Sequence, residues 1–123
     1  MSEHDEQCAL FQLLALYESR YPILHWIHAI PNGGKRHVAT AVKLKREGVL
    51  AGAWDIFCPF AVDGKGGLFI EMKFGKGKLT DNQVAFQNGV GDAYAWEVCY
   101  TGEEAARAIG EYLGIEDLKA VQS

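Results

Sequence analysis

Hydrophobic residues recur at helical spacing in four parts of the chain. In the first part, Leu10, Leu14 and Tyr17 follow one another at intervals of three and four residues, so they share one face of a helix. Ser2 and several acidic residues precede this stripe, which is a typical helix start. Similar stripes and capping residues predict three further helices. The four predicted helices span residues 3–20, 35–47, 80–89 and 101–114.

Four shorter runs are rich in β-branched and aromatic residues and predict strands. The first, residues 23–30, is stopped by a Pro-Asn-Gly-Gly turn. The second and third, residues 54–60 and 68–74, are joined by a glycine-rich segment, so we expect them to form an antiparallel hairpin. Residues 94–100 form the last predicted strand.

The predicted elements follow the order helix, strand, helix, strand, strand, helix, strand, helix. This order is typical of an α/β fold, in which helices cover a mixed β-sheet. The chain has 123 residues, less than an average domain length, and contains no internal repeat and no linker-like segment. We therefore predict a single α/β domain over residues 1–123.

The composition is that of an ordinary folded protein. Hydrophobic residues make up 49% and charged residues 23% of the chain, which excludes a disordered or low-complexity protein. No apolar run approaches the roughly 18–20 residues that span a bilayer, and the acidic N-terminus does not resemble a signal peptide. We expect a cytoplasmic protein with no membrane partner.

Charge is distributed unevenly along the chain. The formal net charge is −4, yet nine basic and four acidic side chains lie between Lys35 and Lys78. Phosphate contacts are local because salt screens charges beyond about 10 Å, so a basic middle could hold a nucleic-acid backbone. A solvated basic surface is the alternative, and the charge pattern alone does not decide the function.

Cysteine and tryptophan residues give no independent sign of a site. Cys8, Cys58 and Cys99 are widely spaced and form no C-x-x-C pair, and none of the four histidines shows ligand spacing. We therefore expect reduced cysteines packed in the core. Trp26 and Trp54 are likewise predicted to be core residues.

The most informative chemistry lies in the predicted hairpin. Glu71 and Lys73 are two residues apart and project from one face of a strand, and the hairpin brings Asp55 towards Glu71. Burying such charges is costly unless they have partners. Two close carboxylates suit a hard divalent cation such as Mg²⁺, to which the backbone carbonyl of Met72 could also contribute. A simple ion pair between Lys73 and one carboxylate is the alternative.

This combination of groups favours phosphodiester hydrolysis. A divalent cation polarises a phosphoryl oxygen and lowers the pKa of a coordinated water towards neutrality. Lys73 could orient or deprotonate the attacking water, or balance charge on the phosphorus.

Several segments resemble a known family in the same order along the chain. They lie at residues 2–7, 30–36 (IPNGGKR), 44–52 (LKREGVLAG), 67–73 (GLFIEMK) and 79–83 (LTDNQ), with the Asp55 strand between the third and the fourth. Together they cover nearly the whole chain, which resembles the VRR-Nuc family of the PD-(D/E)xK nuclease superfamily. One departure is Gly52-Ala53-Trp54-Asp55, where the family usually has G-x-P-D.

The resemblance implies a restriction-endonuclease-like PD-(D/E)xK core with a mixed sheet flanked by helices. It implies Mg²⁺ or Mn²⁺ as cofactor, Asp55 and Glu71 as metal ligands and Lys73 as the catalytic lysine. The family also places a glutamate of the first helix near the metal. Glu3 matches this position better, and Glu6 is the alternative.

The family further places a glutamine on the helix that follows the Glu-x-Lys pair. Gln83 matches this position, so the resemblance implies a role in catalysis. Gln83 also stands three residues after Thr80, the spacing of a capping box, which gives it a competing structural role.

Two loops carry groups that suit phosphate contacts. Residues Asn32, Lys35 and Arg36 lie just before a predicted helix, where backbone N–H groups favour anions. Lys76 and Lys78 follow the Glu-x-Lys strand. Neither loop has the G-x-x-x-x-G-K-[ST] pattern, so we expect no nucleotide cofactor.

We therefore predict a Mg²⁺- or Mn²⁺-dependent, structure-specific DNA endonuclease. The resemblance implies a homodimer of bacterial or phage type that cuts branched DNA such as four-way (Holliday) junctions. No base-reading motif is present, so recognition should depend on backbone path and DNA shape. The alternatives are a nuclease of flaps, ends or single strands, and a DNA-binding module with the same fold but no catalysis.

Overall fold

The strand that carries the Glu-x-Lys glutamate lies inside the sheet and is buried at all five positions. The computed structural model of the chain describes residues 1–31 and 38–122. Its four strands lie in the order β1 (His28–Ala29), β2 (Ile56–Cys58), β3 (Leu68–Met72) and β4 (Ala95–Cys99). β2 is antiparallel to both β1 and β3, whereas β3 and β4 are parallel. The sheet is therefore mixed, as predicted, and contains the expected β2–β3 hairpin.

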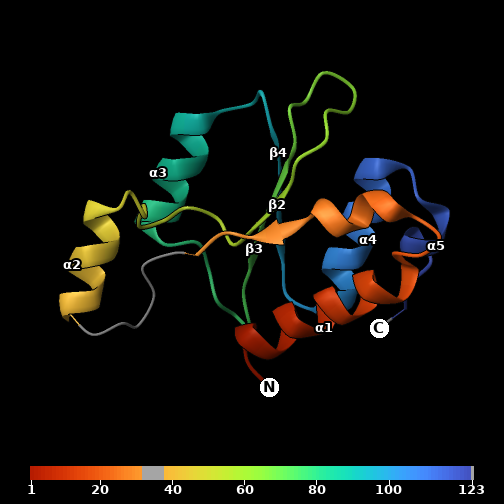
Figure 1. Cartoon of the computed structure of the whole chain (residues 1–123), viewed down its shortest axis with the longest axis horizontal. Coiled ribbons are helices and arrows are strands. Elements are labelled where there is room, and N and C mark those ends of the chain that lie inside the picture. Colours follow the sequence, from red (N-terminus) through yellow and green to blue (C-terminus); the bar gives the residue numbers. More distant parts are fainter. Residues whose placement is uncertain (32–37, 123) are drawn as a thin grey trace.

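Helices flank the sheet on both sides (Figure 1). α1 and α4 lie on one side, α3 lies on the other, and α2 stands apart beyond α3. No helix in residues 1–31 or 38–122 has the length and apolar character that crossing a membrane requires. The α-helices are α1 (Glu3–Tyr17), α2 (Val38–Arg46), α3 (Asp81–Val90), α4 (Gly102–Leu113) and α5 (Glu116–Lys119).

Capping residues explain where three of these helices begin. The side chains of Ser2, Thr80 and Thr101 each accept a hydrogen bond from a backbone N–H of the first helical turn. Such bonds satisfy donors that have no partner inside the helix. The starts of the first, third and fourth predicted helices are thereby confirmed.

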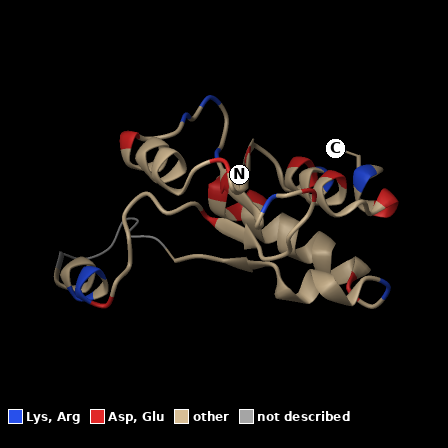
Figure 2. Cartoon of the chain, turned by 90° about the horizontal axis from the view of Figure 1, so that it is seen from above, with Lys and Arg blue, Asp and Glu red and all other residues tan. Residues whose placement is uncertain are grey.

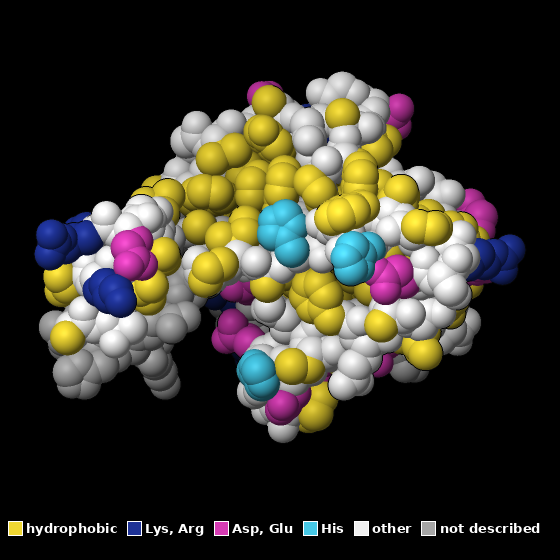
Figure 3. Space-filling model, in the orientation of Figure 1, with side chains coloured by type: hydrophobic (Ala, Val, Ile, Leu, Met, Phe, Trp, Pro, Cys, Tyr) yellow, Lys and Arg dark blue, Asp and Glu magenta, His cyan; other side chains and the backbone are white. Residues whose placement is uncertain are grey.

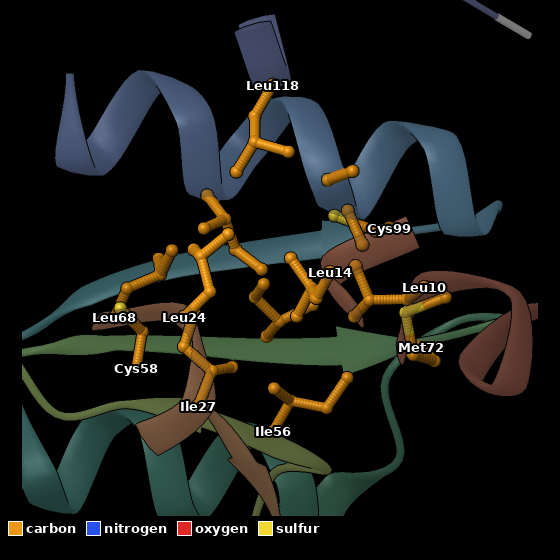
Figure 4. Close-up of a cluster of buried hydrophobic side chains, with 14 of the residues drawn as sticks. Leu10, Leu14, Leu24, Ile27, Ile56, Cys58, Leu68, Met72, Cys99 and Leu118 are labelled. Atoms are coloured by element: carbon orange, nitrogen blue, oxygen red, sulfur yellow. The ribbon is translucent and has the colours of Figure 1, made fainter. Parts of the chain in front are cut away.

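The main core fills the space between the sheet and the α1–α4 pair (Figure 4). Alternate residues of β3, namely Leu68, Ile70 and Met72, pack here with Leu10 of α1 and Ile109 of α4. All five are almost fully buried. This packing fixes β3 against α1, which matters because both elements contribute to the site below.

The opposite face of the sheet is aromatic. The Phe69 ring stacks on Trp96 of β4 at a centroid distance of 4.8 Å and meets Phe86 of α3 edge to face. Side chains alternate between the faces of a strand, so Glu71 shares this face with Phe69. The hairpin therefore presents its acidic residue towards α3.

The strand predicted over residues 23–30 is wrong over most of its length. Residues Pro22–Trp26 form a 3₁₀ helix (η1), and only His28–Ala29 pair with the sheet. Pro22 explains the difference, because its fixed φ and missing N–H suit the first turn of a helix better than a strand. The short helix α5 was not predicted, and α1 ends at Tyr17 rather than at residue 20.

Burial corrects two of the core assignments. Trp54 is 1% exposed, and Cys58 and Cys99 are buried, as predicted. Trp26, at the end of η1, is 62% exposed, and Cys8 lies on the exposed side of α1. Both errors follow from local structure, because the predicted strand 23–30 would have buried Trp26 and α1 turns position 8 away from the sheet.

Candidate metal centre

Three carboxylates from distant parts of the sequence meet at one end of the sheet. Glu3 is the first residue of α1, Asp55 immediately precedes β2, and Glu71 lies near the end of β3. One carboxylate oxygen from each residue lies within 4.8 Å of the others. Acidic residues gather accordingly at the start of α1 (Figure 2). Oxygen atoms at this spacing can share a divalent cation.

Glu71 is the buried member of the cluster, with 1% of its surface exposed. Its Oε2 accepts a hydrogen bond from Gln83 Nε2 at 3.0 Å and lies 3.7 Å from Lys73 Nζ. Its Oε1 is buried and has no hydrogen-bond partner among the described residues. A buried oxygen without a donor is costly, and a cation would satisfy it. The donor set and this oxygen both fit a hard metal ion.

The pKa of Glu71 is raised from 4.5 to about 8, chiefly because the side chain is buried and also because the Asp55 carboxylate lies beside it. The Lys73 ammonium opposes this shift. Without a cation, two carboxylates this close cannot both ionise easily. Glu71 would therefore hold a proton at neutral pH until a positive charge replaces it.

Asp55 is oriented by the strand that holds Glu71. Its Oδ2 accepts a hydrogen bond from the backbone N–H of Met72 at 2.9 Å, and its backbone carbonyl accepts one from Ile30 N–H at 2.7 Å. The Asp55 carboxylate is thus fixed between the first three strands. Met72 supports the site through this N–H, while its side chain is buried in the core.

Trp54 stands where the family pattern has proline, and the structure gives this position a different anchor. The indole Nε1–H donates to the backbone carbonyl of Gln83 at 3.0 Å. Gly52 has φ +90°, and a Cβ there would lie 2.5 Å from the carbonyl oxygen of Asn82. The turn before β2 therefore packs directly on the first turn of α3. Trp54 is buried in the core, as predicted, but no sequence pattern indicates its link to Gln83.

Gln83 takes part in a capping box and also contacts the carboxylate cluster. Its Oε1 accepts the backbone N–H of Thr80 at 2.9 Å, and Thr80 Oγ1 accepts the backbone N–H of Gln83 at 3.2 Å, which completes a capping box. The amide nitrogen is then free to face Glu71. The capping box therefore determines which end of the Gln83 amide faces the carboxylates.

Lys73 directly follows β3 and is only 7% exposed. Its backbone N–H donates to the carbonyl of Cys99 at 2.9 Å, which continues the pairing of β3 with β4. The loop that follows is held by Tyr100, whose hydroxyl donates to the carbonyl of Gly77 at 2.9 Å. The structure thus brings a nearly buried ammonium to the rim of the carboxylate cluster.

Of the two glutamates considered on the first helix, Glu3 joins the cluster. Glu6 is buried elsewhere, and its Oε1 accepts the backbone N–H of Gly102 at 3.0 Å. The two residues are three apart in one turn, so sequence spacing alone did not separate them.

The structure describes only some of the residues that were predicted to bind phosphate. Lys76 and Lys78 are exposed on the loop between β3 and α3. Asn32, Lys35 and Arg36 lie outside the described residues.

The chain has an α/β fold with a carboxylate cluster at the ends of two neighbouring strands. This arrangement is typical of proteins that bind a divalent metal. The sequence matches no model of a known protein family, and no curated protein matches it. A solved structure described as "VRR_NUC domain protein" is similar, with a TM-score of 0.71 and 24% sequence identity. The match covers 93% of this chain and 89% of that one. The resemblance inferred from the sequence motifs is confirmed at the level of the fold.

Proposed function

We propose that the chain is a divalent-metal-dependent DNA endonuclease that hydrolyses phosphodiester bonds. The observation that carries this proposal is the meeting of Glu3, Asp55 and Glu71 within 4.8 Å of one another, beside a nearly buried lysine. The fold shared with a VRR_NUC domain protein supports the same conclusion.

Glu3, Asp55 and Glu71 would hold Mg²⁺ or Mn²⁺, and the Met72 carbonyl is a further candidate ligand. The ion would supply Lewis-acid stabilisation of the phosphoryl oxygens and a lower pKa for the attacking water. Gln83 donates to Oε2 of Glu71, and Oε1 has no hydrogen-bond partner among the described residues, so Oε1 would be available to the ion.

Lys73 would act on the substrate rather than on the metal. Its Nζ lies 3.7 Å from Glu71 Oε2, so its position is fixed by charge as well as by burial. From there the ammonium would donate a hydrogen bond to a phosphoryl oxygen and balance the charge that develops on it. Orientation of the attacking water by Nζ is the second role open to this residue.

Exposed basic side chains on two segments of the chain support a polyanionic substrate. Lys76 and Lys78 lie on the loop that leaves β3, and Lys43, Lys45 and Arg46 are exposed on α2. Figure 3 shows basic side chains on the lobe that carries α2 and acidic side chains on the part of the body that faces it. Basic groups beside an acidic cluster suit a DNA backbone that approaches a metal.

We further propose branched DNA, such as a four-way junction, as the preferred substrate and a homodimer as the active form. Two copies related by a two-fold axis would present two sites to two strands of a symmetric junction. The proposal of branched DNA rests on the family resemblance.

A cleavage assay tests the proposal. An immobile four-way junction, a flap, a linear duplex and a single strand are incubated with equal protein and Mg²⁺, with and without chelator. We expect metal-dependent cleavage that is fastest on the junction, and its loss in Lys73→Met, which preserves side-chain volume. Faster cleavage of the flap or the single strand would contradict branched DNA as the preferred substrate. Salt-dependent binding to DNA without cleavage under Mg²⁺ or Mn²⁺ would contradict catalysis and leave a binding module.

A further inference from the structure

Glu6 is a buried acid that the proposed chemistry does not use. It is 6% exposed, and its Oε1 accepts the backbone N–H of Gly102 at 3.0 Å. Burial of a carboxyl group is costly unless specific contacts compensate for it. The contact that the structure provides lies at the first residue of α4.

This contact lies where the first part of α1 meets the start of α4. The first N–H groups of a helix have no partner inside the helix and favour a negative charge. Gly102 also permits very close packing, because a Cβ there would lie 2.8 Å from the Glu6 carbonyl oxygen and 2.8 Å from Leu10 N. Glu6, which ends the first turn of α1, and the turn that follows it are therefore packed directly against the start of α4.

Glu3 depends on this turn for its position. It is exposed and is the first helical residue of α1, where helices fray most readily. Glu6 follows it by one turn and forms a hydrogen bond from its backbone N–H to the carbonyl of Ser2 at 3.1 Å. The side chain of Glu6 thus joins the segment that carries Glu3 to the body of the protein.

We infer that Glu6 is a positioning residue for the metal centre, which it serves by fixing Glu3 through its bond to Gly102. The inference rests on the proposed metal-binding role of Glu3, Asp55 and Glu71. Residues that orient metal ligands typically change metal affinity by 10- to 100-fold when they are removed.

Mn²⁺ binding measured by calorimetry separates positioning from a general structural effect. We expect Glu6→Ala to weaken binding about tenfold, and to have no further effect in a Glu3→Ala background. Glu6→Gln keeps an oxygen acceptor for Gly102 and should stay within about threefold of the wild type. Asp5→Asn is the matched control, because Asp5 is an exposed acid of the same turn, and it should bind Mn²⁺ as the wild type does.

The outcomes of this experiment are distinguishable. Wild-type protein that binds no Mn²⁺ would overturn the proposed function itself. If the wild type and Glu6→Ala bind Mn²⁺ equally well, the inference alone is overturned. The same follows if Glu6→Ala weakens Mn²⁺ binding as much in the Glu3→Ala background as in the wild type. Glu6→Met, which preserves volume but cannot accept a hydrogen bond, replaces Glu6→Ala if that variant does not fold.

A measurement on the unmodified protein provides a second test. Coupling between two sites is reciprocal, so Mg²⁺ bound at Glu3 must strengthen the bond between Glu6 and Gly102. Hydrogen exchange of the Gly102 amide should slow on addition of Mg²⁺. Slowing of exchange at β3 without any change at Gly102 would contradict the inference.

Discussion

Glu71 connects the stability of the protein with its proposed chemistry. The side chain is 1% exposed, lies beside Asp55, and leaves one oxygen without a donor among the described residues. The same burial that makes the carboxylate costly in the absence of a cation makes it a strong ligand for one, because charges interact more strongly where water is excluded. The residue is therefore expected to respond to both pH and metal.

Without metal, the stability contributed by Glu71 should fall as pH rises. The pKa of Glu71 is raised from 4.5 to about 8 in the folded state, so between these values the folded chain holds a proton that the unfolded chain has released. The free energy of unfolding should therefore decrease across this window, by at most about 1.4 kcal/mol per pH unit. Urea unfolding in chelator at pH 5, 6, 7 and 8 measures the slope.

Glu71→Gln provides the control for this prediction, because the variant has no carboxyl proton to lose at that position. Its stability should change less between pH 5 and pH 8 than that of the wild type, and Mg²⁺ should stabilise only the wild type. Equal pH profiles for the two proteins would contradict the protonation of Glu71.

At the scale of single elements, α3 shows how one capping motif can serve a site. Thr80 and Gln83 close a capping box, and the amide of Gln83 then reaches Glu71 with its nitrogen. The cap and the site therefore use different atoms of one side chain. This division makes the two roles separable by mutation.

Thr80→Ala and Gln83→Glu should have different pH dependences. Thr80→Ala removes the cap and should lower the free energy of unfolding by about 1 kcal/mol at both pH 5 and pH 8. Gln83→Glu keeps an acceptor for Thr80 N–H but adds another carboxylate beside Glu71, next to those of Asp55 and Glu3. Its destabilisation should therefore be larger at pH 8 than at pH 5, because repulsion requires both groups to be ionised. Parallel losses in the two variants at both pH values would contradict the separation of roles.

The elements with strong local signals were predicted best. The helices that follow Ser2, Thr80 and Thr101 form as expected because each of these residues caps the first turn with its side chain. The hairpin was also predictable, because turn residues separate two apolar runs. The strand predicted after Pro22 was wrong because hydrophobic content was given more weight than the backbone preference of proline.

The site was predictable where it depends on strand geometry. Alternation along β3 and pairing with β2 bring Asp55 and Glu71 together, and both facts can be read from spacing. The choice between Glu3 and Glu6 depends on how α1 docks against α4, which is a tertiary property. The link from Trp54 to α3 is likewise a tertiary contact without a local signal.

At the scale of the whole molecule, charge is separated along the chain in a way that suits DNA. The segment between Lys35 and Lys78 has nine basic and four acidic side chains, although the chain as a whole has a net charge of −4. α2 belongs to this segment and stands apart from the sheet (Figures 1 and 2). Its exposed cations can therefore contact a substrate without disturbing the core.

Neutralising Lys43, Lys45 and Arg46 together to glutamine should weaken DNA binding to a similar extent on every sequence tested. Each phosphate contact that is lost should reduce the slope of log affinity against log salt by about 0.9 on duplex DNA. Lys119→Gln is the control, because Lys119 lies outside the basic segment and contacts Glu116. A loss confined to one sequence, or an equal effect of Lys119→Gln, would contradict a phosphate-binding role for α2.

The central claim is that Glu3, Asp55 and Glu71 together hold a single divalent cation. Anomalous diffraction from crystals grown with Mn²⁺ tests this claim most directly, because it locates the ion itself. We predict one anomalous peak within about 2.0–2.6 Å of an oxygen from each of the three carboxylates. Crystals that diffract well in excess Mn²⁺ and show no peak between these residues would contradict the account.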